Sequence, residues 1–487
     1  MDLVSQITII AYLGVLGLLS IYGLHRYFVL FLYFKYYKRR RWAEPPPMRP
    51  DDYPTVTIQL PIFNEYYVAE RVIGSVGNLV YPKDLLTVQI LDDSTDDTRH
   101  IAKTAGEKLA TEGFRVDYIH RDDRVGFKAG ALKAGLERST DELVAIFDAD
   151  FIVPPDFLER TVPYFQDEEV GMVQSRWGYL NRNYSLLTRV QSILLDGHFV
   201  LEHTARCFSG RFFNFNGTGG VFRRKAIDDA GGWDGDTLTE DLDLSYRAQM
   251  AGWRFVFVPD LVCKSELPVD IYGFKTQQHR WTKGSIQVGK KLLPSIWKND
   301  LPLRVKLEAQ FHLSANLCYL LVVLLSGLLP LSLVLRHHLW LNGVEVWEIV
   351  VFVFTTISVV LFYMVSQREI YPDWKWRLKD LPFILALGIG MCINNAWAVS
   401  EALLSRRTPF VRTAKYRIET VKDSWKGKIY RSINTRSLLF EVFFSVYMCA
   451  TFFVLVEFEN WGAMPYLLLF VTGYLYILGL SLLHGKR

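Results

Sequence analysis

The sequence predicts an α/β domain with a mostly parallel sheet, placed between membrane-spanning helices. Three observations support this fold class. Short β-branched or apolar runs alternate with helical stretches early in the chain, a long apolar segment precedes them, and several more apolar segments follow. The composition agrees, because 50% hydrophobic and 14% aromatic residues in a chain of 487 are high fractions for a soluble protein.

The N-terminal segment, 1–41, is predicted to be a membrane anchor. Residues 7–34 are almost continuously apolar, and the basic cluster 35–41 follows them. A cleaved signal peptide is the alternative, but the apolar run is too long, its charges follow rather than precede it, and no small-residue cleavage site is evident. Because clustered Lys and Arg stay on the cytoplasmic side, we expect the N-terminus outside and the next domain in the cytoplasm.

A proline-rich linker, 42–54, leads into the predicted sheet domain, 55–268. Helical stretches near 68–80 and 97–112 separate the expected strands, which indicates parallel pairing. These strands are 55–60, 86–91, 115–119 and 143–147. Ligands of such sheets bind beyond the carboxyl ends of the strands. Polar residues follow three of the strands, namely Asn64 and Glu65, Asp92 and Asp93, and Asp148 and Asp150.

Interfacial helices, 269–310, and a C-terminal membrane bundle, 311–487, complete the predicted organisation. Within the bundle, the stretch 406–436 holds ten Lys or Arg against two acids, which demands a cytoplasmic position. One of the three apolar segments before it should therefore not cross the membrane. We choose 381–403, because its second half is amphipathic, as in an interfacial or re-entrant helix. The candidate segments are 313–335, 346–366, 381–403, 438–457 and 464–483.

Charge, cysteine usage and motifs argue against several functional classes. The basic residues behind the net charge of +4 concentrate beside membrane segments, so no nucleic-acid partner is indicated. The five cysteines lack CxxC spacing, which argues against a disulfide framework or a zinc site. No GxGxxG follows the first strand and no GxxxxGK[ST] occurs, so neither a dinucleotide fingerprint nor a P-loop is supported.

Asp148 and Asp150 are candidate ligands of a divalent cation. They stand two residues apart at a strand end, and their oxygens suit Mg²⁺ or Mn²⁺ while leaving coordination sites for phosphate. An isolated pair of this kind is more often a solvated turn, but the acidic groups at matching strand ends favour a metal site. Lys128, beside two glycines, is either a cation that neutralises a diphosphate or a surface lysine.

Glu240 and Asp241 precede an amphipathic stretch and are candidates for acid–base chemistry. The alternative is an acidic helix N-terminus that the helix dipole favours, with Thr239 as its cap. Both interpretations can hold together. A carboxylate at such a terminus is expected to stay ionised at neutral pH and could act as a general base.

Two further segments are candidates for sugar binding. The small-residue turn 213–220, which contains Asn216, Gly217 and Thr218, either lets a ligand approach the backbone closely or is an ordinary tight turn. The pentapeptide Gln-Gln-His-Arg-Trp offers an amide at Gln277, a guanidinium for phosphate at Arg280 and a flat indole for a sugar ring at Trp281. The alternative interpretation is that this pentapeptide belongs to a surface helix anchored at the lipid interface.

In this order, the motifs resemble those of family-2-type inverting glycosyltransferases, especially the processive membrane synthases. The likeness is greatest to cellulose-synthase-like mannan and glucan synthases, extends to bacterial cellulose synthase, and covers about residues 55–300. A looser match lies in the stretch 405–437, which resembles the gating loop of cellulose synthases but has Arg412 in place of valine. The main motifs are Gln-Leu-Pro-Ile-Phe-Asn-Glu (59–65), Leu-Asp-Asp-Ser-Thr (91–95), Phe-Asp-Ala-Asp-Phe (147–151), Phe-Asn-Gly-Thr (215–218), Glu-Asp (240–241) and the pentapeptide 277–281.

The resemblance implies a GT-A-type sheet and a role for each motif. Asp148 and Asp150 would hold the metal ion, and Asp241 would be the catalytic base with Glu240 beside it. The implied nucleotide-sugar-binding residues are Asn64, Glu65, Asp92, Asp93, Lys128, Asp148, Gln277 and Arg280. The implied acceptor-binding residues are Trp281, Asn216, Gly217 and Thr218, and those of the gating loop are Phe410, Thr413 and Lys415.

The predicted function is inverting transfer of a hexose from GDP-mannose or UDP-glucose to a growing β-1,4-mannan, glucomannan or glucan, with Mg²⁺ or Mn²⁺ as cofactor. A non-processive glycolipid synthase with a lipid acceptor, of the glucosyl-diacylglycerol or ceramide type, is the first alternative. A non-catalytic membrane transporter or scaffold is the second. The expected location is a bacterial inner or plasma membrane or a Golgi-type membrane, with membrane lipid as a partner and the catalytic domain cytoplasmic.

Overall fold

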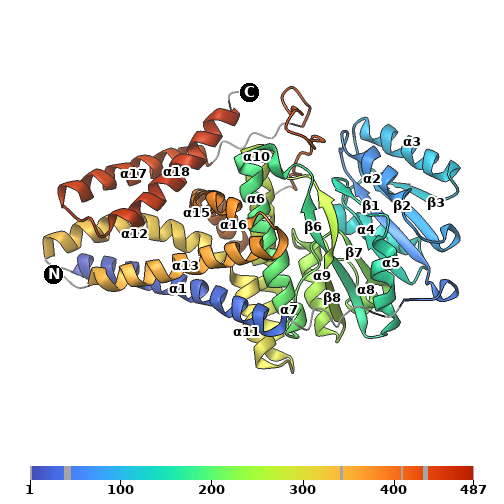
Figure 1. Ribbon diagram of the computed structural model, residues 1–487, viewed down its shortest axis with the longest axis horizontal. Helices are drawn as coiled ribbons and strands as arrows, with labels where there is room; N and C mark the ends of the chain where they lie inside the picture. The colour runs from blue at the N-terminus through green and yellow to red at the C-terminus, as the bar shows by residue number, and fades with distance from the viewer. Residues whose placement is uncertain are drawn as a thin grey trace.

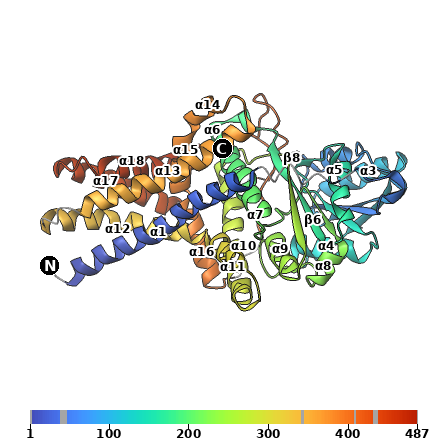
Figure 2. The same cartoon turned by 60° about the horizontal axis from the view of Figure 1, so that its bottom comes forward.

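The computed structural model describes residues 3–37, 45, 47–339, 344–406, 410–430 and 437–485. A mixed α/β domain lies at one end of the molecule and a bundle of long helices at the other (Figure 1). The helix α10 (Ile271–Lys298) runs between them in both views (Figures 1 and 2). An α/β sheet between an N-terminal apolar helix and C-terminal apolar helices is the predicted fold class, which the structure confirms.

The sheet contains eight strands in the order β3-β2-β1-β4-β7-β6-β8-β5. The first four strands along the chain pair in parallel, as predicted, whereas β7 pairs antiparallel with both β4 and β6. Strands β1 and β4 are almost entirely buried, as is usual for central parallel strands. The bounds are β1 (Val56–Ile62), β2 (Leu86–Asp92), β3 (Arg115–His120), β4 (Leu143–Ile146), β5 (Phe151–Ile152), β6 (Val170–Tyr179), β7 (Gly220–Arg223) and β8 (Arg254–Ser265).

Short helices connect these strands, and two of them, α2 and α3, correspond to the predicted helical stretches. A pair of buried amides ties α4 to the sheet, since Gln59 donates to Gln89 at 3.0 Å and Gln89 donates to the Gly135 carbonyl at 2.9 Å. The bounds are α2 (Ala69–Val76), α3 (Thr98–Thr111), α4 (Phe127–Glu137), α5 (Phe157–Thr161), α6 (Leu186–Asp196), α7 (Thr204–Phe208), α8 (Arg224–Asp229) and α9 (Glu240–Met250), with a π-helical turn at Gly197–His203.

Five of the described helices are long and apolar enough to cross a membrane, so the chain is a multi-pass integral membrane protein. Both views place α1 alongside α12 and α13 (Figures 1 and 2). The five helices are α1 (Leu3–Tyr36), α12 (Leu317–Leu339), α13 (Val344–Ile370), α17 (Leu438–Glu457) and α18 (Met464–Gly485).

The predicted segment 381–403 is not one continuous helix. It consists of α15 (Leu381–Gly390) and α16 (Cys392–Leu403), and the helical path bends by 41° at the break between them. Such a bend occurs in broken spans and in re-entrant segments, so the expectation that this segment does not cross stays a prediction. Two short helices, α11 (Leu303–Ser314) and α14 (Trp374–Arg377), flank the neighbouring spans.

Parts of three predicted segments lie outside the described residues. These parts are 38–41 of the basic cluster, 42–44 and 46 of the linker, and 407–409 with 431–436 of the gating-like loop.

Buried polar contacts hold α10 against the membrane bundle. The Lys275 ammonium lies 2.5 Å from a Glu441 oxygen on α17 and donates to the Ser481 hydroxyl on α18 at 2.8 Å. Lys283 pairs with Glu401 of α16 at 2.9 Å. Because a buried charge is stable only when it is paired, these contacts define how α10 sits beside the bundle.

On its other side, α10 packs closely against the turn that precedes α9. A Cβ added at Gly284 would lie 2.5 Å from the Thr239 Cγ2 atom and 2.9 Å from the Thr239 backbone nitrogen. Only glycine permits this approach, which brings the middle of α10 over the start of α9.

We predict that Gly284→Ala destabilises the protein, whereas Gly74→Ala does not. Both changes gain helix propensity of about 1 kcal/mol, but a Cβ at Gly74 meets nothing within 4 Å. At position 284, overpacking should outweigh this gain by about 1–2 kcal/mol. Thermal unfolding of the purified variants measures the difference, and equal melting temperatures would contradict the close packing.

Candidate active site

A cavity of about 190 Å³ lies where the carboxyl ends of β1, β2 and β4 meet α10 and the stretch 410–415. Most of the predicted site residues line it, although they come from distant parts of the chain. They are Glu65, Asp93, Lys128, Asp148, Asp150, Asn216, Gly217, Glu240, Asp241, Gln277, Arg280, Trp281, Phe410, Thr413 and Lys415. The predicted residues that do not line it are Asn64, Asp92 and Thr218.

Each carboxylate of the Asp148 and Asp150 pair contacts a lysine ammonium group. Lys128 contacts Asp148 and also donates to the Gly217 carbonyl at 2.7 Å. Lys415 lies 2.7 Å from Asp150. Burial raises the pKa of Asp148, an effect that the Lys128 charge opposes. The two carboxylates therefore form a site that attracts positive charge.

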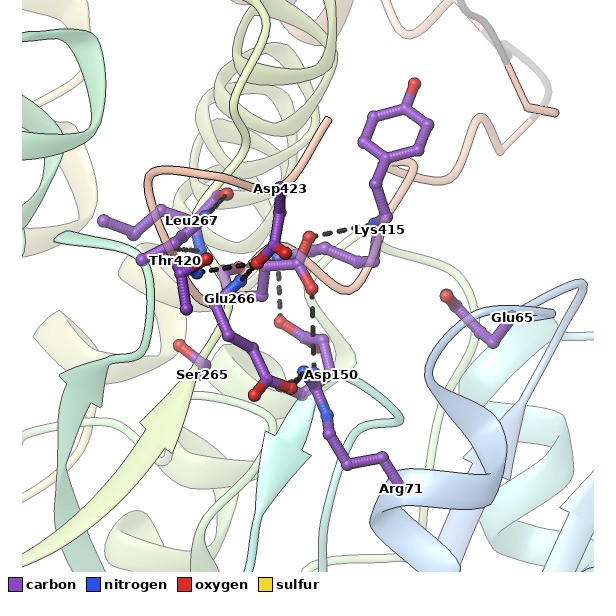
Figure 3. A network of polar contacts seen from close by, with 12 residues as sticks. Glu65, Arg71, Asp150, Ser265, Glu266, Leu267, Lys415, Thr420 and Asp423 are labelled. Atoms are coloured by element: carbon purple, nitrogen blue, oxygen red, sulfur yellow. Dashed lines mark hydrogen bonds and ion pairs between the residues drawn. The ribbon is translucent and has the colours of Figure 1, made fainter. Parts of the chain in front are cut away.

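A polar network surrounds Asp150 and connects three segments of the chain (Figure 3). Arg71 of α2 donates to the Asp150 carbonyl at 3.1 Å and lies 3.7 Å from Glu266, which follows β8. The Tyr416 backbone donates to Glu266 at 2.9 Å. These contacts fix the stretch around Lys415 beside the strand ends.

Glu240 and Asp241 begin α9 and face the same cavity. Burial, followed by the charge of Glu240, raises the pKa of Asp241 to about 7. The expectation that this carboxylate is fully ionised at neutral pH therefore needs correction, because desolvation outweighs the favourable helix dipole. A side chain with this pKa can accept a proton near neutral pH.

The prediction that Thr239 caps the N-terminus of α9 is only partly confirmed. Thr239 occupies the N-cap position, but its side chain makes no cap hydrogen bond. Its hydroxyl is buried without a hydrogen-bond partner among the described residues. A Cβ built at Gly284 would lie 2.6 Å from this hydroxyl, so α10 packs closely against the cap residue.

Gln277, Arg280 and Trp281 line the cavity from α10, consistent with their spacing of three and four residues along one helical face. The Arg280 guanidinium lies 4.9 Å from the centroid of the Phe410 ring. Within the described part of the chain, Arg280 has no carboxylate within 4.0 Å, so its donors remain available to an anion. Trp281 lies 6.4 Å from Trp177, measured between ring centroids.

The turn at 216–218 approaches the acidic start of α9 closely. Gly217 has a φ of +81°, and a Cβ there would lie 3.0 Å from Asp241 Oδ2. Asn216 contacts two histidines of the π-helical turn, with Oδ1 2.6 Å from His203 and Nδ2 3.0 Å from His198. Thr218 does not line the cavity, and its hydroxyl accepts a hydrogen bond from the Asp148 amide at 2.9 Å.

The stretch 410–415 covers the cavity through both rings and charges. Phe410 stacks on Phe127 with 5.2 Å between ring centroids. Arg412, where the resembling loop has valine, pairs with Glu65 at 2.9 Å. Burial raises the pKa of Glu65 to about 7, although the Arg412 charge opposes this rise. The Thr413 hydroxyl is buried and has no hydrogen-bond partner among the described residues.

Asp92 and Asp93 are adjacent but face opposite ways. Asp93 lines the cavity, and its two carboxylate oxygens accept hydrogen bonds from Nε and Nη2 of Arg121, at 2.8 and 2.6 Å. Asp92 is fully buried and accepts hydrogen bonds from the Tyr118 hydroxyl at 2.6 Å and the Ser94 amide at 2.9 Å. Asn64 similarly accepts from the Thr95 amide at 2.8 Å, which joins the loops after β1 and β2.

The sequence motifs did not identify several residues that line the cavity. Trp177 lies in β6, outside any motif, and Glu266 follows β8. Arg124 lies 3.2 Å from the centroid of the Phe63 ring and also lines the cavity. The only sequence signal for Arg124 was its position two residues before the glycine that precedes α4.

A separate acidic cluster consists of Asp234, Asp236 and Asp243. The Lys291 ammonium lies 2.8, 2.9 and 3.1 Å from these three carboxylates, so a resident cation already balances them. The cluster lies outside the cavity, and the sequence did not predict it as a metal site.

Comparison with known proteins gives several matches. Glucomannan 4-beta-mannosyltransferase 2 of Arabidopsis thaliana is 43% identical over 253 residues, which are 51% of this chain and 47% of that protein. This chain therefore spans about half the length of that relative, and likewise 51% of glucomannan 4-beta-mannosyltransferase 1 of Oryza sativa subsp. japonica. A solved mannosyltransferase from Pyrobaculum calidifontis, in complex with GDP-Man and Mn²⁺, is 20% identical with a TM-score of 0.49, and the match covers 80% of this chain and all of that one.

Two further matches are extensive enough to decide the family. Probable glucomannan 4-beta-mannosyltransferase 15 of Arabidopsis thaliana is 32% identical over 434 residues, covering 86% of this chain and 77% of that protein. The sequence model described as glycosyl transferase family group 2 matches residues 143–399, more than half of the chain. The chain therefore belongs to glycosyl transferase family group 2.

Proposed function

We propose that the protein transfers mannose from GDP-mannose, with inversion, to the non-reducing end of a growing β-1,4-mannan or glucomannan, with UDP-glucose as the second donor for the mixed polymer. The observation that carries this proposal is one cavity that holds a paired-carboxylate site, a candidate base at Asp241, an unpaired guanidinium at Arg280 and an indole at Trp281. The names of the plant relatives support the choice of mannose. The catalytic domain would lie in the cytoplasm, with the bundle in a Golgi-type or plasma membrane.

The cavity fits a divalent cation at Asp148 and Asp150. Both residues present hard oxygen donors, and each already attracts a lysine ammonium group. These two carboxylates would hold Mg²⁺ or Mn²⁺, which neutralises diphosphate charge when bound. The cluster of Asp234, Asp236 and Asp243 does not line the cavity that holds Asp241 and Arg280, so it is not the metal site of this proposal.

Each of these side chains has a separate role in the proposed transfer reaction. Asp241 takes the proton from the acceptor hydroxyl, which then attacks the anomeric carbon from the face opposite the leaving diphosphate. Arg280 and Lys128 stabilise the negative charge that develops on this diphosphate. Trp281 provides a flat apolar surface for the terminal acceptor sugar, and Gly217 leaves room for that sugar beside Asp241.

Product analysis tests the proposed function. Membranes containing the protein are incubated separately with radiolabelled GDP-mannose and UDP-glucose, and the products are extracted and then digested with β-mannanase or β-glucanase. The proposal predicts an insoluble, mannanase-sensitive polymer from GDP-mannose. A chloroform-soluble product with one or two sugars would instead indicate the glycolipid synthase, and no transfer from any donor would revive the transporter alternative.

We predict that Asp241→Asn reduces transfer by about 10²–10⁴-fold, because the amide cannot accept the proton. Donor binding should survive, since the substitution keeps the shape of the side chain. Initial rates and equilibrium binding of GDP-mannose measure the two effects. Asp260→Asn, at an exposed position of β8, is the matched control and should keep the wild-type rate. Full activity of Asp241→Asn would remove Asp241 from the catalytic role.

The pH dependence of kcat/KM should reflect the raised pKa of Asp241. Only the ionised carboxylate acts as a base, so kcat/KM should be level above about pH 7 and fall about tenfold per pH unit below it. Glu65 has a similar pKa, so the profile is repeated with Glu65→Gln. The acid limb should persist in that variant. A profile that stays level down to pH 5.5, or a limb that disappears with Glu65→Gln, would contradict the assignment.

A further inference from the structure

A second cavity, of about 510 Å³, lies on the membrane side of the sheet domain. Its wall combines the end of β6 and the turn after it with Lys264 of β8, Tyr371 just beyond α13, and the stretch 419–421. None of the predicted site residues lines this cavity, although 419–421 belong to the gating-like stretch 405–437, and the proposed transfer reaction does not use it.

The wall of this cavity carries three positive charges that no carboxylate of the described residues contacts directly. It contains Arg176, Arg182 and Lys264, and within the described part of the chain none of these has a carboxylate within 4.0 Å. Among the described residues of its wall, the only acidic one is Glu419, which pairs with Arg71 at 2.8 Å. The more distant Asp196 and Asp380 offset part of the Arg182 charge, but no described carboxylate contacts the three cations directly, as expected of an anion site.

Arg182 has buried donors without partners. Its Nε and Nη2 atoms, and the Tyr179 hydroxyl beside it in the wall, are buried and make no hydrogen bond with the described residues. Arg182 and Arg377 both lie against the Tyr371 ring, with guanidinium carbons 5.2 and 3.5 Å from its centroid. Arg377 pairs with Asp373 at 2.9 Å, whereas the buried donors of Arg182 are unfavourable unless an anion supplies acceptors for them.

The position of the cavity indicates where such an anion comes from. Tyr371 directly follows the last residue of α13, which is long and apolar enough to cross a membrane. Trp376, on the next short helix, is 78% exposed, as expected of an indole at the lipid interface. A basic pocket beside the end of a membrane-spanning helix is typical of sites for phosphate-bearing lipid headgroups.

The stretch 410–421 contributes to both cavities. Residues 410–415 cover the candidate active site, whereas 419–421 line the second cavity. Asp423 shapes the intervening turn by accepting hydrogen bonds from the Glu419 and Thr420 amides at 2.8 and 2.7 Å (Figure 3). Arg71 contacts both Glu419 and the Asp150 carbonyl, which joins the turn to the metal-type carboxylates.

We propose that the second cavity binds the phosphate group of an anionic membrane lipid through Arg176, Arg182 and Lys264. The bound phosphate supplies acceptors for the unpaired Arg182 donors and contacts the wall formed by 419–421. Occupancy therefore stabilises the stretch that covers the candidate active site. This site is independent of the proposed donor and acceptor, and a binding measurement tests it without reference to transfer activity.

Binding of dioctanoyl phosphatidic acid to the purified full-length protein in phosphatidylcholine nanodiscs tests the proposal. We expect saturable binding, about tenfold or more weaker in Arg182→Gln, because a charge-assisted hydrogen bond is lost. Lys264→Gln should also weaken binding, and because the Lys264 side chain is exposed, this substitution should leave the fold intact. Backbone amides of 416–421 should exchange more slowly with deuterium when the lipid is bound.

Two control variants separate this site from other cations. Arg160→Gln removes an exposed arginine elsewhere on the domain, and Arg280→Gln removes the guanidinium of the candidate active site. Both should bind phosphatidic acid like the wild type. Wild-type affinity in Arg182→Gln and Lys264→Gln, or a loss confined to Arg280→Gln, would overturn the proposal. Inorganic phosphate binding as tightly as phosphatidic acid would overturn its lipid source.

Discussion

The balance of charge at the carboxyl edge of the sheet is the constraint on which the rest of the structure depends. Parallel pairing of β1, β2 and β4 brings carboxylates to one edge, and the start of α9 adds two more. Such a concentration of negative charge is stable only with cations close by. The chain supplies them from three distant segments, namely Lys128 of α4, Arg280 of α10, and Arg412 and Lys415 of the stretch over the cavity.

The need for cations close to the carboxylates is also consistent with the position of α10 between the sheet domain and the bundle. One side of this helix carries Arg280 over the carboxylates, and Lys275 and Lys283 of the same helix form buried ion pairs with the bundle. Any shift of the bundle that moves α10 also moves a guanidinium relative to Asp148 and Asp241. Membrane insertion and the chemistry of the cavity are therefore mechanically connected.

Periodicity and strand-end positions predicted the part of the fold that follows from local sequence. The four parallel strands and the convergence of Glu65, Asp93 and Asp148 follow directly from alternating elements in a parallel sheet. Local sequence could not tell that Asp92 turns into the core while Asp93 faces the cavity, because both follow the same strand. It also could not reveal the break between α15 and α16, or the antiparallel half of the sheet, which depend on long-range packing.

Tertiary contacts also decided several details of the candidate site. Thr239 has the sequence of a helix cap, but Gly284 packs against it and its hydroxyl makes no cap bond. The helix dipole favours an ionised Asp241, whereas burial beside Glu240 raises its pKa. Trp177 lies outside every sequence motif, because its place in the cavity wall depends on where β6 passes Trp281. Each case requires knowledge of which distant segments meet.

A structure of the protein with GDP and Mn²⁺ bound tests the proposed metal site most directly. We predict Mn²⁺ density between the carboxylates of Asp148 and Asp150, with the Lys128 and Lys415 ammonium groups displaced toward the diphosphate and Arg280 in contact with it. Mn²⁺ at Asp234, Asp236 and Asp243, with the diphosphate away from Arg280, would contradict this assignment.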